Sequence, residues 1–216
     1  MKNFEEKYSV SHETFLKLQT YLSLLKEWQE KFNLVSSSSL EDAWNRHFLD
    51  SAQLFKYVPE TAKTLVDMGS GAGFPGMVLA ILSNEKTPYL NITLVESISK
   101  KTMYLKEVSK KTQTKVEIVN GRIEEIKNKK FDVLTSRAMT SLDKLLSYAL
   151  PFCKKETICI FPKGKKYAEE LSEAHKKWQF KCRIEPSELS EEGKILIISN
   201  LKKKKEKANA KNLSNS

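Results

Sequence analysis

Four glycines lie close together in one short stretch of the chain, TLVDMGSGAGFPGMVLAI, at Gly69, Gly71, Gly73 and Gly76. The whole chain holds only 7 glycines. Because glycine has no side chain, such a cluster lets a ligand approach the backbone closely. An apolar run precedes the glycines and another follows Pro75, which suits a turn from a strand into a helix. We interpret the stretch as a ligand-binding turn, with a phosphate, a dinucleotide and S-adenosylmethionine as candidate ligands.

The residues after the glycines test the first two ligands. A Walker phosphate loop has Lys and then Ser or Thr after its last glycine, but Met77 follows Gly76, so this motif is excluded. The dinucleotide fingerprint GxGxxG is matched from Gly71 to Gly76. Glu96 lies about 20 residues further on, where an acidic residue would bind a ribose. A dinucleotide therefore remains open.

The pattern for S-adenosylmethionine fits the same turn. It reads D-x-G-x-G-x-G from Asp67 to Gly73. Backbone amides of the turn would meet the methionine carboxylate, and Asp67 would help to hold the methionine ammonium. Glu96, at the end of the next predicted strand, would accept both ribose hydroxyls. The turn alone does not separate this ligand from a dinucleotide, and a turn with a purely structural role is a third interpretation.

From Thr64 onward, short β-rich runs alternate with helical segments. The predicted strands cover 64–68, 92–97, 115–120, 131–136, 156–161, 180–185 and 194–199. The predicted helices cover about 75–84, 98–111, 122–128, 140–150 and 165–177. This alternation indicates a parallel sheet with both faces covered. Only PSELSEEG separates the last two strands, so they are predicted to form an antiparallel hairpin. The predicted fold is α/β, a class I methyltransferase (Rossmann-like) fold with a seven-stranded, mostly parallel sheet and a C-terminal antiparallel hairpin.

The residues before the sheet have helical periodicity. Apolar residues recur at steps of three or four between 11 and 34, and Ser11 is the predicted N-cap. Ser39 with Asp42 resembles a capping box that would start a second helix. We predict an N-terminal helical extension over 1–60, packed on an S-adenosylmethionine-dependent methyltransferase domain over 61–200.

Composition places the chain among soluble globular proteins. It has 216 residues, of which 40% are hydrophobic and 30% charged, and its formal net charge is +10. The segment 201–216 holds six lysines and one glutamate, half of that net charge, and is predicted to be a disordered lysine-rich tail. Such a tail serves either solubility or contact with nucleic-acid phosphates.

Other features indicate a cytoplasmic protein. The N-terminus has no apolar core of a signal peptide, and no apolar run reaches the roughly 18 residues of a membrane span. Cys153, Cys159 and Cys182 are odd in number and lack the spacing of a zinc site, which suggests reduced thiols and no metal. No long heptad pattern is present, so a monomer is expected.

Segments on both sides of the turn make a family resemblance specific. DMGSGAGFPGMVLAI is preceded by NLVSS and WNRHFLDS and followed by GRIEEI and SRAMTSLDKLL. From about Asn33 to Lys165 the chain resembles small-subunit ribosomal RNA methyltransferase G, also called glucose-inhibited division protein B. The resemblance implies transfer of a methyl group from S-adenosylmethionine to N7 of guanine 527 in the 530 loop of 16S rRNA. It also implies 16S rRNA, in the 30S subunit or its precursor, as the partner.

The resemblance further implies cofactor contacts by Gly69, Phe74, the Ile123–Glu124 pair and Arg137. Each of the larger side chains has an alternative interpretation. Phe74 either walls the pocket or packs in the core. Glu124 either lies at the adenine edge or is a helix N-terminal acid. Arg137 either binds at the carboxyl edge of the sheet or forms a surface ion pair.

No catalytic acid or base is predicted. The fourth predicted strand ends in TSRAM, without the Asn-Pro-Pro-Tyr type of motif for exocyclic amines and without the cysteine needed at pyrimidine C5. Guanine N7 carries an in-plane lone pair, so the enzyme acts chiefly through proximity and orientation. Arg137 and His47 are the positioning candidates.

Two other expectations concern partners. Lys163, Lys165 and Lys166 either contact RNA phosphates or form a solvated loop. An NAD-dependent oxidoreductase and a non-catalytic RNA-binding scaffold are the alternative functions.

Overall fold

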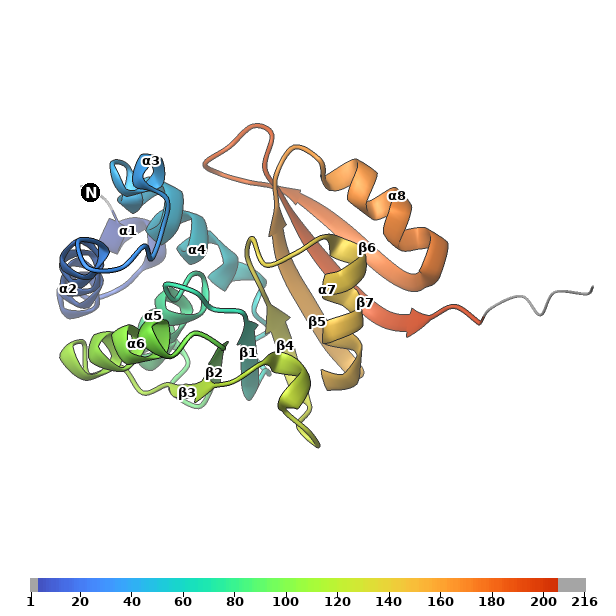
Figure 1. Ribbon diagram of the computed structural model, residues 1–216, viewed down its shortest axis with the longest axis horizontal. Helices are drawn as coiled ribbons and strands as arrows, with labels where there is room; N and C mark the ends of the chain where they lie inside the picture. Colours follow the sequence, from blue (N-terminus) through green and yellow to red (C-terminus); the bar gives the residue numbers. More distant parts are fainter. Residues whose placement is uncertain (1–3, 206–216) are drawn as a thin grey trace, which may run out of the picture.

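The computed structural model describes residues 4–205, and its centre is one seven-stranded sheet (Figure 1). The strand order is β3-β2-β1-β4-β5-β7-β6. All pairs are parallel except those that β7 makes with β5 and β6, which are antiparallel. The strands are β1 Thr64–Met68, β2 Asn91–Glu96, β3 Glu117–Asn120, β4 Phe131–Thr135, β5 Cys153–Lys163, β6 Trp178–Pro186 and β7 Lys194–Lys203. The predicted fold class is confirmed.

The strand order reverses between β1 and β4. The chain runs outward from β1 through β2 to β3, then returns to β4 on the other side of β1. The loops that leave β1 and β4 therefore diverge to opposite faces and leave a crevice between them. This crevice lies at the carboxyl end of β1, where the glycine turn begins.

Four longer helices follow the strands much as predicted. They are α5 Gly76–Lys86, α6 Ser99–Lys111, α7 Leu142–Ala149 and α8 Tyr167–Lys177, with a 3₁₀ turn η4 at Leu150–Phe152. The helix predicted over 122–128 was wrong, because only a 3₁₀ turn, η3 Ile123–Glu125, forms there. The Glu125 carboxylate accepts from the Arg122 N–H and closes this turn, and Asn128 adopts a left-handed φ of 57°.

The N-terminal residues form six short or medium helical segments. They are α1 Phe4–Tyr8, α2 His12–Gln29, α3 Ser37–Leu40, the π-helix η1 Trp44–Leu49, α4 Asp50–Ala52 and the 3₁₀ helix η2 Gln53–Tyr57. Ser11 caps α2 as predicted, since its hydroxyl accepts from the Thr14 N–H at 3.2 Å. The predicted capping box was wrong: α3 begins at Ser37, and the Ser39 hydroxyl donates to the carbonyl of Ser36 instead.

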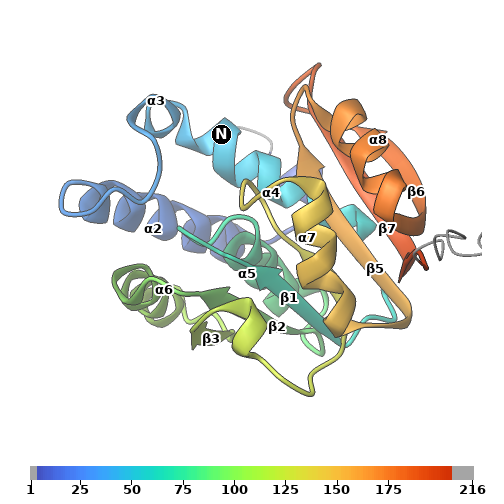
Figure 2. The same ribbon diagram turned by 45° about the vertical axis from the view of Figure 1, so that its right-hand side comes forward.

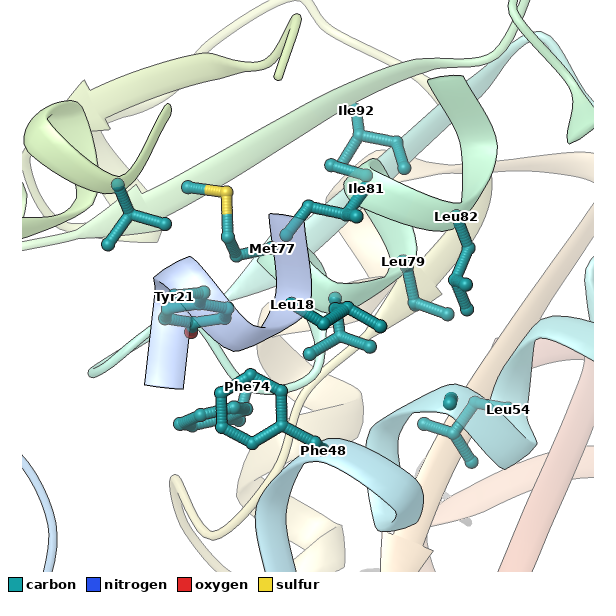
Figure 3. Close-up of a cluster of buried hydrophobic side chains, with 14 of the residues drawn as sticks. Leu18, Tyr21, Phe48, Leu54, Phe74, Met77, Leu79, Ile81, Leu82 and Ile92 are labelled. Carbon is teal, nitrogen blue, oxygen red and sulfur yellow. The ribbon is translucent and has the colours of Figure 1, made fainter. Parts of the chain in front are cut away.

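Helices cover both faces of the sheet. Figures 1 and 2 show α2, α5 and α6 together on one side and α7 and α8 on the other. The first face holds an aromatic cluster in which Phe74 stacks on Tyr21 at 5.2 Å between ring centroids and meets the edge of Phe48 at 5.1 Å (Figure 3). Tyr21 comes from α2 and Phe48 from η1, so the helical extension packs directly beside the glycine turn.

The end of the sheet extends further than the sequence suggested. β7 continues to Lys203, and Leu201 is buried, so the first residues of the predicted tail 201–216 belong to the strand. The remainder of that tail, 206–216, lies outside the described residues. Within residues 4–205 no helix is long and apolar enough to cross a membrane.

Candidate active site

Two adjoining cavities open at the carboxyl edge of β1 and β2. The first, the turn cavity, has a volume of about 640 Å³, and six of the predicted residues line it: His47, Gly69, Gly71, Phe74, Glu96 and Arg137. The second, the side cavity, measures about 170 Å³ and is lined by Gly69, Ile123 and Glu124 among others. The two share Gly69, Ser97 and Met139. The structure thus gathers most of the predicted site residues, and the remaining two, Asp67 and Gly73, line neither cavity.

The turn owes its shape to backbone that only glycine adopts easily. Gly69 and Gly71 have φ angles of +68° and +58°, in the left-handed region. A Cβ at Gly71 would meet nothing nearer than a backbone oxygen at 4.0 Å, so its α-carbon faces open space. The turn is held from the side by Glu96, whose carboxylate accepts from the N–H groups of Gly71 and Ile98, each at 2.8 Å.

Glu96 is well placed for a polar ligand. Glu96 is only 6% exposed, lies at the end of β2 and lines the turn cavity. Each carboxylate oxygen accepts one backbone hydrogen bond and retains a second lone pair. The side chain is therefore fixed in position and still able to accept hydroxyl donors.

Gly73 and Gly76, the last two glycines of the motif, allow neighbouring side chains to pack closely against the backbone. A Cβ at Gly73 would come within 2.8 Å of Leu105, and a Cβ at Gly76 within 2.6 Å of the Asp67 carboxylate. That carboxylate, fully buried below the turn, accepts from the Gly76 N–H at 3.0 Å. Burial raises the pKa of Asp67 to about 7. In this arrangement Asp67 ties β1 to the start of α5, and its predicted contact with a methionine ammonium stays a prediction.

The side cavity lies beside η3. Ile123 is buried to 2% exposure and presents an apolar wall, while Glu124 is exposed at the rim. Met139 separates this cavity from the turn cavity, because its Cγ and Sδ lie 3.1 Å from the position of a Cβ on Gly69. The sequence analysis missed Met139, although its place just after SRA at the end of β4 was a usable signal.

Arg137 connects the helical extension to the turn. Its guanidinium donates to Nδ1 of His47 at 2.8 Å, to the Asp50 carboxylate at 3.2 Å and to the carbonyl of Arg46 at 2.8 Å. It also lies over the Phe74 ring, 5.2 Å from the centroid. The ion pair predicted for Arg137 is present, and Arg137 also lines the cavity, while its contact with a cofactor stays a prediction.

His47 is neutral in this setting. Its ring stacks on Phe74 at 4.9 Å, and its Nε2 lies 3.0 Å from the Ser39 hydroxyl. Because Nδ1 accepts from Arg137, the proton is on Nε2 and is donated to Ser39. Burial, and then the charges of Arg137 and Arg46, lower the pKa of His47 to about 4.

Phe74 packs in the core and also lines the turn cavity, so the two interpretations given for it do not exclude each other.

A third cavity, the outer cavity, adjoins the first on the side of β4 and β5. It has a volume of about 430 Å³ and shares Arg137, Ala138 and Met139 with the turn cavity. Lys163 lines it and is not a solvated surface lysine: its side chain is 10% exposed and bonds to Glu170 at 2.8 Å. Lys165, in contrast, is exposed and pairs with Glu192. Glu170, one of the two acids of this cavity, carried no signal in the sequence, because it belongs to a short polar helical pattern.

Comparisons with known proteins agree with this geometry. The family model of rRNA small subunit methyltransferase G (GidB) matches residues 15–210. The chain belongs to this family. It is 40% identical over 202 residues to ribosomal RNA small subunit methyltransferase G of Parvibaculum lavamentivorans, covering 93% of this chain and 89% of the relative. The corresponding protein of Rhodospirillum centenum is 39% identical over 199 residues, covering 92% and 90%. The resemblance inferred from the sequence is confirmed.

Solved structures share the fold of this family member. A TehB-like SAM-dependent methyltransferase from Corynebacterium glutamicum aligns with a TM-score of 0.55 at 13% identity, covering 84% of this chain and 98% of that one. TYW2 from M. jannaschii, solved with AdoMet, aligns with a TM-score of 0.54 at 15% identity, covering 79% and 78%. At these identities the likeness shows a class I methyltransferase fold and nothing finer.

Proposed function

We propose that this methyltransferase G family member transfers a methyl group from S-adenosylmethionine to N7 of a guanine in 16S rRNA, the guanine being position 527 of the 530 loop. The observation that carries the proposal is that the Gly69–Gly71 turn, Glu96 and Arg137 line one cavity at the switch point of the sheet. Family membership favours this reaction over a dinucleotide-dependent oxidation.

The residues present fit the cofactor. The ribose hydroxyls suit the fixed carboxylate of Glu96, and the adenine suits the side cavity, against Ile123 and beside Glu124. The methionine carboxylate suits the guanidinium of Arg137, since the Gly71 N–H already donates to Glu96. S-adenosylmethionine, when bound, supplies a methyl group whose bond to sulfur breaks with its electron pair left on sulfur, while the N7 lone pair forms the new bond and no proton is exchanged.

The side chains of the site act by holding and orienting. Arg137 is locked by three partners and by stacking, so its guanidinium is preorganised at the mouth of the turn cavity. His47 is neutral at neutral pH, so its Nδ1 accepts from Arg137 and helps to fix the guanidinium. No general base is required, because guanine N7 loses no proton in the reaction.

The substrate and its setting complete the proposal. The target base must leave its stack to reach the crevice, as in other enzymes that modify bases. We propose 16S rRNA in the 30S subunit or its precursor as the partner, a monomeric enzyme and a cytoplasmic location. The basic formal charge of the chain suits such a polyanion.

The test is to map 7-methylguanosine in 16S rRNA by mass spectrometry from cells with and without this gene. Loss of the modification at one position, restored by the wild-type gene, is the expected result. An unchanged map, or tight binding of NAD(H) without binding of S-adenosylmethionine in calorimetric titration, would overturn the proposal. Failure to transfer methyl despite tight binding to rRNA would instead identify a non-catalytic scaffold.

A first prediction concerns Arg137. Arg137→Ala removes charge-assisted hydrogen bonds worth roughly 1.5–3 kcal/mol, so affinity for S-adenosylmethionine should fall about 10- to 100-fold. Arg137→Lys should recover only part of this loss, because lysine lacks the planar fork and stacks poorly. Calorimetric titration measures both variants. Arg183→Ala, an exposed arginine on β6, is the control and should bind as the wild type does.

A further inference from the structure

We propose that the outer cavity receives the target guanine and that Glu170 recognises the N1–H and N2–H edge of that base. The inference rests on the proposed function, because it identifies the substrate side of the same site. Glu170 belongs to α8, and neither the family comparison nor the sequence analysis assigned it a role.

The position of the outer cavity suits a base that must meet the cofactor. Arg137, Ala138 and Met139 form a common wall between it and the turn cavity. The ends of β4 and β5 lead into the outer cavity from one side, and Lys194 and Ile195 at the start of β7 line another part. Its volume of about 430 Å³ falls within the range of roughly 300–1,000 Å³ that is common for small-molecule pockets. A single flipped-out base therefore has room there.

The carboxylate of Glu170 is held firmly on one side only. Its Oε2 accepts from the Leu142 N–H at 2.6 Å and from Lys163 Nζ at 2.8 Å. Lys163 is fixed in turn, since it also donates to the Thr140 carbonyl at 3.0 Å. Among residues 4–205, no donor forms a hydrogen bond with Oε1 of Glu170. Glu170 therefore presents one oriented oxygen, with both lone pairs available, in the lining of the outer cavity.

Asp50 is the other carboxylate in this cavity, and it is less suitable. Its Oδ1 accepts from Gln53 at 2.8 Å and its Oδ2 from Arg137 at 3.2 Å, so both oxygens are engaged. Asp50 orients Arg137, which leaves Glu170 as the acceptor for a base.

Guanine matches this acceptor. Its N1–H and N2–H donors lie side by side, on the edge of the purine opposite N7. We place that edge toward Glu170 and N7 toward the common wall at Arg137–Met139, and hence toward the turn cavity. Adenine has an acceptor at N1 and no amine at C2, so the same carboxylate would repel it. Glu170 would thus select guanine and direct N7 at the same time.

The same contact favours the reaction itself. Methylation at N7 leaves a positive charge on the base, which makes N1–H and N2–H stronger donors. A hydrogen bond to the fixed carboxylate therefore strengthens as the reaction proceeds. Interactions that are stronger in the transition state raise the rate of the chemical step, not only binding. Replacement of Glu170 should accordingly lower the single-turnover rate as well as the affinity for RNA.

The test uses the full-length protein and 16S rRNA ligated around an oligonucleotide that carries guanosine or inosine at the target position. Inosine lacks the N2 amine, so the wild type should methylate it about 10-fold more slowly than guanosine, the loss of one charge-assisted hydrogen bond. Glu170→Gln should slow methylation of guanosine about 10- to 100-fold and reduce the preference over inosine to less than about 3-fold. Because this preference is a ratio, it does not depend on the amount of folded enzyme.

Two further measurements distinguish recognition from a structural role. Affinity for S-adenosylmethionine, from calorimetric titration, should be unchanged in Glu170→Gln, and Glu170→Asp should recover part of the guanosine preference. Glu169→Gln, an exposed neighbour on α8, is the matched control and should behave as the wild type. A full guanosine preference in Glu170→Gln, or a loss of cofactor affinity equal to the loss of rate, would overturn the inference. A wild type that transfers no methyl to guanosine RNA would overturn the proposed function, and this inference with it.

Discussion

The turn cavity and the outer cavity adjoin each other but are built in different ways. The turn that shapes the first comes from one continuous stretch, Gly69–Phe74, and backbone hydrogen bonds and buried packing fix it. The outer cavity collects side chains from segments more than a hundred residues apart, and the ion pairs Arg137–Asp50 and Lys163–Glu170 hold them. A site formed by local backbone can be recognised from a short sequence motif. A site formed by paired side chains appears only once the chain is folded.

The largest expected effect separates the two kinds of glycine within the turn. Gly76→Ala would drive a Cβ into Leu94 and to 2.6 Å from Asp67, so we expect a loss of about 3 kcal/mol in the free energy of unfolding. Gly71→Ala meets open space and bears only the strain of its left-handed φ, about 1 kcal/mol. Its added methyl projects toward the turn cavity, however, and should weaken binding of S-adenosylmethionine. Urea unfolding measures the free energy of unfolding, and calorimetric titration measures the affinity for S-adenosylmethionine.

Gly164→Ala is the control for these variants, since nothing lies within 4 Å of its Cβ position. It should leave the free energy of unfolding within about 0.5 kcal/mol of the wild type. If Gly71→Ala proved as destabilising as Gly76→Ala, the division of the motif into ligand-facing and packing glycines would be wrong.

The next prediction sharpens the contrast at Glu96. Glu96→Gln keeps the shape of the side chain but loses the charge and one of the two acceptors that hold the Gly71 and Ile98 N–H groups. Affinity for S-adenosylmethionine should fall about 10-fold, the value of one charge-assisted hydrogen bond, whereas the guanosine preference over inosine should not change. Glu156→Gln, on an exposed position of β5, is the control. A changed base preference in Glu96→Gln would show that the two cavities are not separable.

The same contrast explains what the sequence could predict. Alternating buried strands and helices specified the parallel part of the sheet, because burial on both faces leaves a continuous apolar signal. The terminal hairpin followed from the short connection between its two strands. The glycine spacing indicated the turn, because left-handed φ angles at Gly69 and Gly71 demand glycine locally. The helix predicted over 122–128 was wrong because the Glu125 carboxylate closes a single turn on the Arg122 N–H, a local contact that apolar periodicity does not register.

The outer cavity had no comparable signal. Glu170 sits in a polar pattern shared with its exposed neighbour Glu169, and its significance depends on Lys163 and the Leu142 N–H, which folding brings to it. Arg137 was found only through the family resemblance, and its partners His47 and Asp50 lie about ninety residues earlier. Contacts across such separations leave no mark in the spacing of one sequence.

The last expected effect is a pH dependence at His47, which lines the turn cavity and contacts Arg137 of the common wall. In the folded protein the pKa of His47 is about 4, because burial and then the charges of Arg137 and Arg46 disfavour its protonation. In the unfolded chain its pKa is about 6.5. Between these values the unfolded chain binds more protons, so stability rises with pH and is lost as the pH falls from about 6.5 toward 4. By pH 5 the loss from this residue should be roughly 1–2 kcal/mol.

Comparison with His47→Gln isolates this contribution. The absolute slope is not diagnostic, because Asp67, whose pKa is raised to about 7, gives a stability that falls as the pH rises from about 4 toward 7. Urea unfolding at pH 5 and pH 7 should show that the wild type loses roughly 1–2 kcal/mol more than His47→Gln on acidification. An equal loss in wild type and His47→Gln would mean that His47 is protonated beside Arg137 in the folded protein. The guanidinium could then not donate to Nδ1, and the orientation of Arg137 at the common wall would rest on Asp50 and the Arg46 carbonyl alone.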